Sequence, residues 1–381
     1  MSYSEFSFFA ADSKQSEGVE DLTGGITTEV VSADIRDRDQ LWNEGFLNVN
    51  KEFLIGAGTR QYRYPDPHEL GRQGIEDGHA YSVLRAVDYS GERLLMVKNP
   101  WGRTEWTGPW SDGSQEWTAQ ALKDLDYTFG NEGIFWMPYT DFLQRFVQIW
   151  CTRLFSPEWR ISQHWTTIQV PWSGGYTPTI FEFTLTSSSR TVIALSQLDS
   201  RYFGGLTGQY FYELAFRLQM HNDEKYIIRG YSSGDRSAVT EVDLKPGTYV
   251  VLMKVQAFRD STQPTITDVI TQSWLSRRDK LIRSGIAYDT AHAKGQTKTS
   301  ANKRKKIAKA ITKDAALVAL GHLDDPPATK TAASAQGEPW NASLVIGLRV
   351  FCRGTAATIR VVDLNNQNWW RRKRWSRQLT D

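Results

Sequence analysis

The stretch Gly78-His-Ala-Tyr-Ser-Val83, followed further along by Lys98-Asn-Pro-Trp-Gly102, indicates how the first part of this chain folds. Between the two motifs lie the runs Tyr81–Tyr89 and Arg93–Lys98, which are rich in β-branched and apolar residues. They meet at Ser90-Gly91, a pair of residues typical of a tight turn. The sequence therefore predicts an antiparallel hairpin.

Such a hairpin places His79 and Asn99 at the same end of the strand pair. There the amide oxygen of Asn99 can accept a hydrogen bond from one imidazole nitrogen of His79 and leave the other free for proton transfer. A lone histidine beside a strand is more often a structural residue than a catalytic one, so the neighbouring residues decide the interpretation.

Those neighbouring residues resemble a known family. Gly-His-Ala-Tyr-Ser at 78–82, Asn-Pro-Trp-Gly-Arg-Thr-Glu-Trp-Thr-Gly-Pro-Trp-Ser-Asp at 99–112 and Gly-Ile-Phe-Trp-Met at 133–137 closely resemble the second half of the protease core of calpains, which are calcium-dependent, papain-like cysteine proteases. Glu20-Asp-Leu-Thr-Gly-Gly25 resembles the calpain segment that joins the two halves of the core. The resemblance implies that His79 and Asn99 are triad residues and that Trp101 shields their hydrogen bond from water.

The triad nucleophile is not evident in this sequence. In this family the thiolate and the glutamine of the oxyanion hole precede the histidine, but the only cysteines here are Cys151 and Cys352, and neither is expected to be catalytic. We therefore expect the C-terminal portion of a truncated calpain-like endopeptidase, inactive alone and acting on protein substrates only when completed by a first half. The alternative is a non-catalytic calpain-like protein with a binding or regulatory role.

Three acidic residues, Glu105, Asp112 and Glu132, occupy positions that form a calcium site in calpains by the same resemblance. Calcium prefers six to eight oxygen ligands. In calpains the motif before Phe-Trp ends on an acidic residue, whereas Ile134 stands here. The resemblance thus makes calcium a candidate cofactor with a degraded site, and no organic cofactor is expected.

The expected fold class is α+β, with a partial papain-like protease core followed by an antiparallel β-sandwich that contains a helical insertion. Short alternating runs separated by Gly, Ser, Asn and Pro indicate the sandwich. The expected parts are a lead-in at 1–19, the half-core at 20–154, the sandwich at 155–365 with an insertion at about 259–339, and a tail at 366–381.

Apolar spacing predicts helices over Asp39–Phe53 and Pro138–Phe146, and two helical stripes within the insertion. The first stripe consists of Trp274, Leu275, Leu281, Ile282 and Ile286, and the second of Ile307, Ile311, Ala315 and Val318.

The 381 residues carry a net charge of +2 and contain neither a signal peptide nor an apolar run of membrane-spanning length, which predicts a soluble, cytoplasmic protein. The tail Trp369-Trp-Arg-Arg-Lys-Arg-Trp-Ser-Arg377 interleaves basic and aromatic residues. It suits an anionic membrane or an acidic partner, and no specific nucleic acid is expected. The alternative is that the tail is a solvated terminal run.

Overall fold

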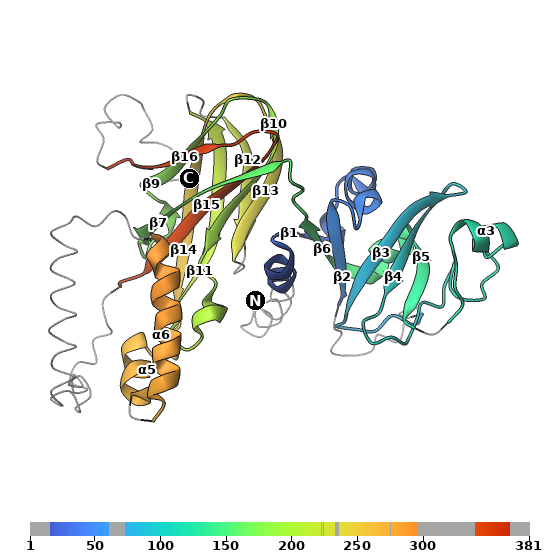
Figure 1. Ribbon diagram of the computed structural model, residues 1–381, viewed down its shortest axis with the longest axis horizontal. Coiled ribbons are helices and arrows are strands. Elements are labelled where there is room, and N and C mark those ends of the chain that lie inside the picture. The colour runs from blue at the N-terminus through green and yellow to red at the C-terminus, as the bar shows by residue number, and fades with distance from the viewer. Residues whose placement is uncertain are drawn as a thin grey trace. The chain divides into compact units, whose positions relative to one another are not determined.

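The computed structural model describes residues 16–60, 73–130, 132–221, 223, 225–232, 236–274, 276–295 and 340–365. The chain forms two compact units, Met1–Pro157 and Glu158–Asp381 (Figure 1). Sheets predominate and helices are few, so the fold is α+β with a β-sandwich, as expected.

One antiparallel sheet of six strands organises the first unit, in the order β1-β6-β2-β3-β4-β5. A helical segment at residues 16–23 precedes it. The strands are β1 (Ile26–Val31), β2 (Phe53–Thr59), β3 (Ala80–Tyr89), β4 (Glu92–Lys98), β5 (Ile134–Pro138) and β6 (Phe146–Arg153).

The predicted hairpin is present and consists of β3 and β4. Tyr89 pairs with Glu92, so the turn has two residues. Its residues Ser90 and Gly91 have φ angles of 50° and 86°. Positive φ at both positions is the signature of the type I′ turn, whose twist matches that of the strands it joins.

The helix predicted over Asp39–Phe53 is shorter and broken. Three short helical pieces replace it, namely α2 (Arg38–Gln40), η2 (Leu41–Gly45) and η3 (Phe46–Asn48). The middle piece is a π-helical turn that ends at glycine, a residue that disfavours a continuous helix. The prediction was therefore right about the apolar face and wrong about its regularity.

Aromatic side chains fill the core of this unit. Trp42 and Phe46 of the helical pieces pack against Tyr139 and Phe142 of α4 (Tyr139–Arg145), a helix that the sequence predicted. All four side chains are at most 3% exposed. A further short helix, α3 (Ala119–Asp124), begins at Thr118, whose side chain accepts from the Ala121 N–H as an N-cap.

The second unit is a sandwich of two antiparallel sheets. One has four strands in the order β13-β10-β15-β7, and the other is ordered β12-β11-β14-β9-β16 with β8 beside β14. The strands are β7 (Trp159–Gln169), β8 (Gly175–Tyr176), β9 (Thr179–Leu185), β10 (Ser189–Gln197), β11 (Tyr210–Met220), β12 (Tyr226–Ser232), β13 (Ser237–Leu244), β14 (Gly247–Arg259), β15 (Ser343–Arg353) and β16 (Thr358–Asp363).

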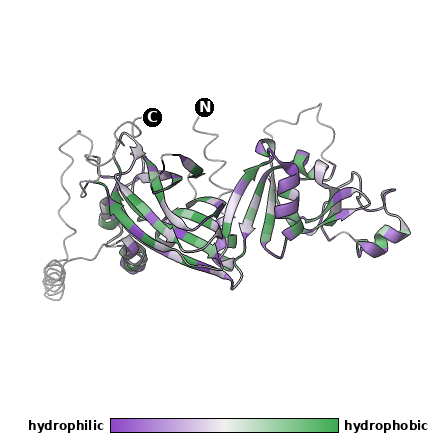
Figure 2. Ribbon diagram, turned by 90° about the horizontal axis from the view of Figure 1, so that it is seen from above, coloured by the Kyte–Doolittle hydropathy of each residue, from purple (hydrophilic) through white to green (hydrophobic). Residues whose placement is uncertain are grey.

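Alternation along these strands builds the sandwich core. In β9, Phe181, Phe183 and Leu185 belong to one buried cluster with residues of both sheets, whereas Glu182 points to the opposite face. Figure 2 shows the resulting alternation of hydrophobic and hydrophilic residues along the strands.

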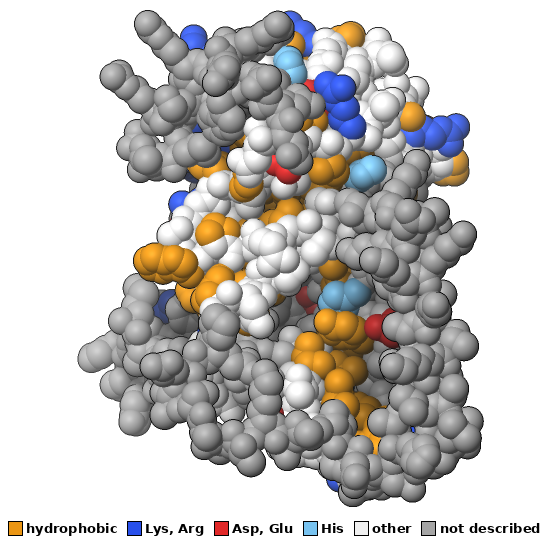
Figure 3. All heavy atoms as spheres, turned by 90° about the vertical axis from the view of Figure 1, so that its left-hand side faces the viewer, with side chains coloured by type: hydrophobic (Ala, Val, Ile, Leu, Met, Phe, Trp, Pro, Cys, Tyr) orange, Lys and Arg blue, Asp and Glu red, His pale blue; other side chains and the backbone are white. Residues whose placement is uncertain are grey.

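Two helices follow β14, where the sequence predicted an insertion: α5 (Ile266–Ser273) and α6 (Arg278–His292). The first predicted stripe crosses the break between them, and Ile282 and Ile286 of α6 are exposed rather than buried. This helix packs instead through Tyr288 and His292, whose rings contact Phe203. Figure 3 shows that hydrophobic side chains are also exposed on one side of this unit.

Several predictions fall on residues outside the described ranges. They are residues 1–15 of the lead-in predicted at 1–19, the second helical stripe within 296–339 and the basic tail at 366–381. Among the helices that the structure describes, none combines the length and hydrophobicity needed to cross a membrane.

Candidate active site

His79 lies at the end of a loop, directly before β3. Its backbone is tied to the last residue of β2, because its N–H donates to Thr59 Oγ1 over 2.9 Å and its carbonyl accepts from the Thr59 N–H over 3.0 Å. The ring is half-buried, and its Nε2 lies 2.8 Å from Asn99 Oδ1. The structure therefore brings together the two residues that the hairpin argument paired.

Asn99 follows β4 and is completely buried, with 0% of its surface exposed. Its Nδ2 donates to the carbonyls of Arg103 and Thr104, over 2.8 and 3.2 Å. Its Oδ1 accepts from the Trp101 N–H over 3.0 Å as well as from His79. The side chain thus makes four hydrogen bonds and has no competing orientation, because a flipped amide would direct its oxygen at two carbonyl oxygens.

This fixed amide determines the protonation of the imidazole. An amide oxygen can only accept, so His79 Nε2 carries the hydrogen in the neutral ring. Nδ1 then holds the lone pair and can take up a proton. Among the described residues, Nδ1 has no hydrogen-bond partner. This is the arrangement that a general base requires.

Two aromatic rings flank the histidine. The Trp101 ring lies over the imidazole, with centroids 4.0 Å apart and planes inclined by 33°. The Tyr81 ring meets it edge-on at 5.0 Å. Trp101 is itself 56% exposed, so it covers the imidazole from the solvent side rather than from within the core.

Neither cysteine can act as a nucleophile where it lies. Cys151 is in β6 and Cys352 in β15, and both are buried. Burial raises the pKa of the Cys151 thiol to about 12 and also raises that of Cys352. A nucleophilic cysteine needs a depressed pKa and access to substrate, and these thiols have neither.

Two of the three candidate calcium ligands accept hydrogen bonds within the protein. Glu105 Oε1 accepts from the Gly133 N–H over 2.8 Å, and Asp112 Oδ1 accepts from the Tyr127 hydroxyl over 2.7 Å. Burial raises the pKa of Glu105, and the nearby carboxylates of Asp112 and Glu132 add to this. Among the described residues, no group of three or more His, Cys, Asp or Glu side chains is arranged to hold a metal ion. Calcium binding by Glu105, Asp112 and Glu132 therefore stays a prediction.

Gly133 is a residue of this site whose role the sequence did not reveal. Its carbonyl accepts from the Asn99 N–H over 2.7 Å, and its φ angle is 77°. A Cβ at this position would lie 2.8 Å from the Asn99 carbonyl oxygen. Its place between Glu132 and Ile134 was visible in the sequence, but its contact with Asn99 comes from tertiary packing.

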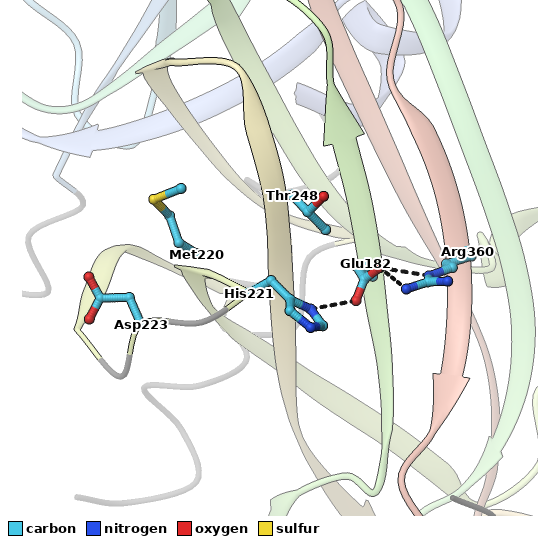
Figure 4. A pocket seen from close by; sticks show the side chains of 6 residues that line it. All are labelled: Glu182, Met220, His221, Asp223, Thr248 and Arg360. Carbon is cyan, nitrogen blue, oxygen red and sulfur yellow. Dashed lines mark hydrogen bonds and ion pairs between the residues drawn. The ribbon is translucent and has the colours of Figure 1, made fainter. Parts of the chain in front are cut away.

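A second candidate site is an open pocket of about 560 Å³ on the sandwich (Figure 4). At its base is Glu182, which is buried and ion-paired with Arg360 of β16, with Nε 2.6 Å from Oε1. His221 Nδ1, just after β11, lies 2.7 Å from Glu182 Oε2. These contacts join three elements of one sheet, which fits a structural role.

Comparisons with known proteins give sequence matches to the first unit. Residues 4–153 match the family model described as calpain family cysteine protease. The rice calpain-type cysteine protease ADL1 (Oryza sativa subsp. japonica) is 37% identical over 154 residues, which cover 38% of this chain and 7% of that protein. The bovine calpain-1 catalytic subunit (Bos taurus) is 32% identical over 170 residues, which cover 38% of this chain and 23% of that protein.

The chain thus spans less than a quarter of the length of these relatives. Among solved structures, the clostridial cysteine protease Cwp84 aligns with 61% of this chain and 56% of its own chain at 13% identity. The TM-score of that alignment is 0.20, which is too low to support a structural argument.

Proposed function

We propose that residues 4–153, which match the calpain family model, contribute the general base and the orienting amide to the active site of a calpain-type cysteine endopeptidase. The observation that carries the proposal is the 2.8 Å contact between His79 Nε2 and a fully buried, four-bonded Asn99. In this proposal the six-stranded sheet is half of a papain-like core. The sandwich is the module that follows it in calpains.

The proposed mechanism gives each residue one task. His79 Nδ1 takes the proton of a cysteine thiol, and the thiolate attacks the carbonyl carbon of the scissile peptide bond. The imidazolium then protonates the leaving amine as the bond to nitrogen breaks, leaving an acyl-enzyme. A water molecule, deprotonated by His79, releases the acyl group as a carboxylic acid and restores the thiol.

Asn99 and Trp101 act on His79 in this scheme. Asn99 holds the imidazole in the Nε2–H tautomer, and the indole limits the access of water to that hydrogen bond. The thiol must come from a cysteine other than Cys151 and Cys352, since both are buried in β-strands with raised pKa values. We therefore propose that this chain alone is inactive, and calcium enters no step of the scheme.

Complementation tests this proposal. The purified chain is mixed with a separately expressed first half of a calpain protease core, which carries the cysteine, and casein cleavage is measured. We expect no cleavage by the chain alone, cleavage by the mixture, and loss of that cleavage in His79→Ala. His164→Ala is the matched control, because His164 is exposed on the sandwich strand β7.

Two outcomes would count against the proposal. Cleavage by the chain alone that His79→Ala abolishes would disprove its inactivity. Stable binding of the first half without any cleavage would favour the alternative, a non-catalytic binding protein of the same family.

A further inference from the structure

The loop that carries His79 is anchored by two hydroxyl groups that belong to neighbouring strands. Thr59 ends β2, and Tyr81 is the second residue of β3. Both side chains are buried, with exposed fractions of 9% and 2%. Neither residue reaches Asn99 in the hydrogen bonds of the described site.

Both hydroxyls bind the same peptide segment of the loop, at Glu76. The Glu76 N–H donates to the Tyr81 hydroxyl over 2.9 Å, and the Glu76 carbonyl accepts from Thr59 Oγ1 over 2.7 Å. Thr59 Oγ1 also accepts from the His79 N–H over 2.9 Å. Glu76 and His79 are therefore held at a fixed separation by side chains of the sheet.

The Thr59 side chain takes the place of a backbone acceptor for the His79 N–H. The β2–β3 ladder ends where Gly58 pairs with Ala80, so the His79 N–H has no ladder acceptor of the usual kind. The Thr59 hydroxyl oxygen accepts this hydrogen bond instead, and the same hydroxyl donates a hydrogen bond to the Glu76 carbonyl. Valine at position 59 would keep the shape and the β-propensity but leave two partly buried backbone groups, the Glu76 carbonyl and the His79 N–H, without the threonine hydroxyl.

Tyr81 combines this anchoring with contact to the ring itself. Its hydroxyl stays protonated at neutral pH, because burial raises its pKa to about 12. Its ring packs edge-on against the imidazole and against Phe146 of the core. A displacement of more than about 0.4 Å at His79 would lengthen the 2.8 Å contact between Nε2 and Asn99 beyond good hydrogen-bond geometry.

We propose that Thr59 and Tyr81 are positioning residues that hold His79 in the Nε2–H tautomer against Asn99. The inference rests on the proposed function, since the tautomer matters because His79 is the proposed base. It deepens that proposal by extending the site to two hydroxyls that act through the backbone of the loop.

The test is the ¹⁵N spectrum of the imidazole in the full chain, which reports the tautomer directly and requires no catalysis. His79→Gln assigns the signal. We expect the wild-type ring in the Nε2–H form, and an Nδ1–H fraction raised roughly threefold or more in Tyr81→Phe and Thr59→Val. Thr59→Ser should retain the wild-type spectrum, because it keeps the hydroxyl.

Tyr139→Phe is the matched control. Tyr139 is a buried tyrosine of the same core whose hydroxyl donates to the Arg38 carbonyl, and its ring packs against Trp42 and Phe46. An unchanged tautomer in both Tyr81→Phe and Thr59→Val would overturn the inference. An equal change in Tyr139→Phe would also overturn it, by revealing a general loosening of the core. If Thr59→Val does not fold, Tyr81→Phe and its control decide the outcome.

The outcomes for the tautomer and for the proposed function are separable. If the variants change the tautomer but no first half restores casein cleavage to the wild-type chain, the positioning role stands and the proposed protease function fails. If the complemented wild type cleaves casein but the variants keep the wild-type tautomer, the protease function stands and the positioning role fails.

Discussion

Asn99 determines which imidazole nitrogen of His79 acts as the base in the candidate site. Its two carbonyl contacts, at Arg103 and Thr104, fix the amide, the amide fixes the imidazole tautomer, and the tautomer leaves Nδ1 as the basic atom. The basicity of Nδ1 therefore depends on the Asn99 side chain, which has no exposed surface. A residue of this kind is recognised by its hydrogen bonds rather than by its polarity.

Thiol reactivity tests the exclusion of the two cysteines. Because burial raises the pKa of Cys151 to about 12 from an ordinary value of 9.0, we expect no alkylation by iodoacetamide at neutral pH in the folded chain. The unfolded chain forms thiolate first as the pH rises. The thiol's contribution to stability is therefore complete below pH 9 and is lost as the pH approaches 12.

Mass spectrometry after native and denaturing alkylation measures this directly. Both cysteines should be labelled in denaturant, which serves as the control. Rapid native labelling of Cys151 would contradict its placement in β6 and would return it to the list of possible nucleophiles.

At the scale of elements, the features that follow from local sequence could be predicted better than those that depend on long-range contacts. The β3–β4 hairpin follows from a two-residue turn and adjacent apolar runs, and α4 from apolar spacing, so both could be predicted. β1 was not predicted, because among the described strands it pairs with β6 alone, whose residues lie more than a hundred positions later. Thr59 and Gly133 were missed for the same reason, since their role is a contact made only in the folded chain.

Gly133 offers a test of how β5 holds the Asn99 loop. Gly133→Ala forces a Cβ to within 2.8 Å of the Asn99 carbonyl oxygen at a φ angle of 77°. We expect a loss of about 2–3 kcal/mol in the free energy of unfolding, measured by urea denaturation, together with a disturbed His79 imidazole spectrum.

Gly91→Ala, in the turn between β3 and β4, is the matched control for Gly133→Ala. Gly91 also has a positive φ angle, 86°, but a Cβ there would meet no atom within 4 Å. We expect it to cost about 1 kcal/mol through backbone strain alone and to leave the His79 spectrum unchanged. Equal losses for the two variants would show that strain, and not the contact with Asn99, is the cost at Gly133.

The whole molecule contains two compact units, each with its own buried cluster, and this predicts two thermodynamically separate domains. Phe142 is fully buried in the first cluster and Phe183 in the second. Truncation of either to alanine removes a similar buried volume and should cost about 3–5 kcal/mol. Differential scanning calorimetry of the full chain should then show that each substitution lowers one melting transition and leaves the other in place.

The two variants act as controls for each other. Because the site lies entirely within the first unit, Phe183→Ala should also preserve the His79 imidazole spectrum at temperatures where the sandwich has melted. A single transition that shifts with both substitutions would mean that the units fold cooperatively. In that case the candidate site would depend on the sandwich for its stability, and the matched family segment could not be treated as a folding unit of its own.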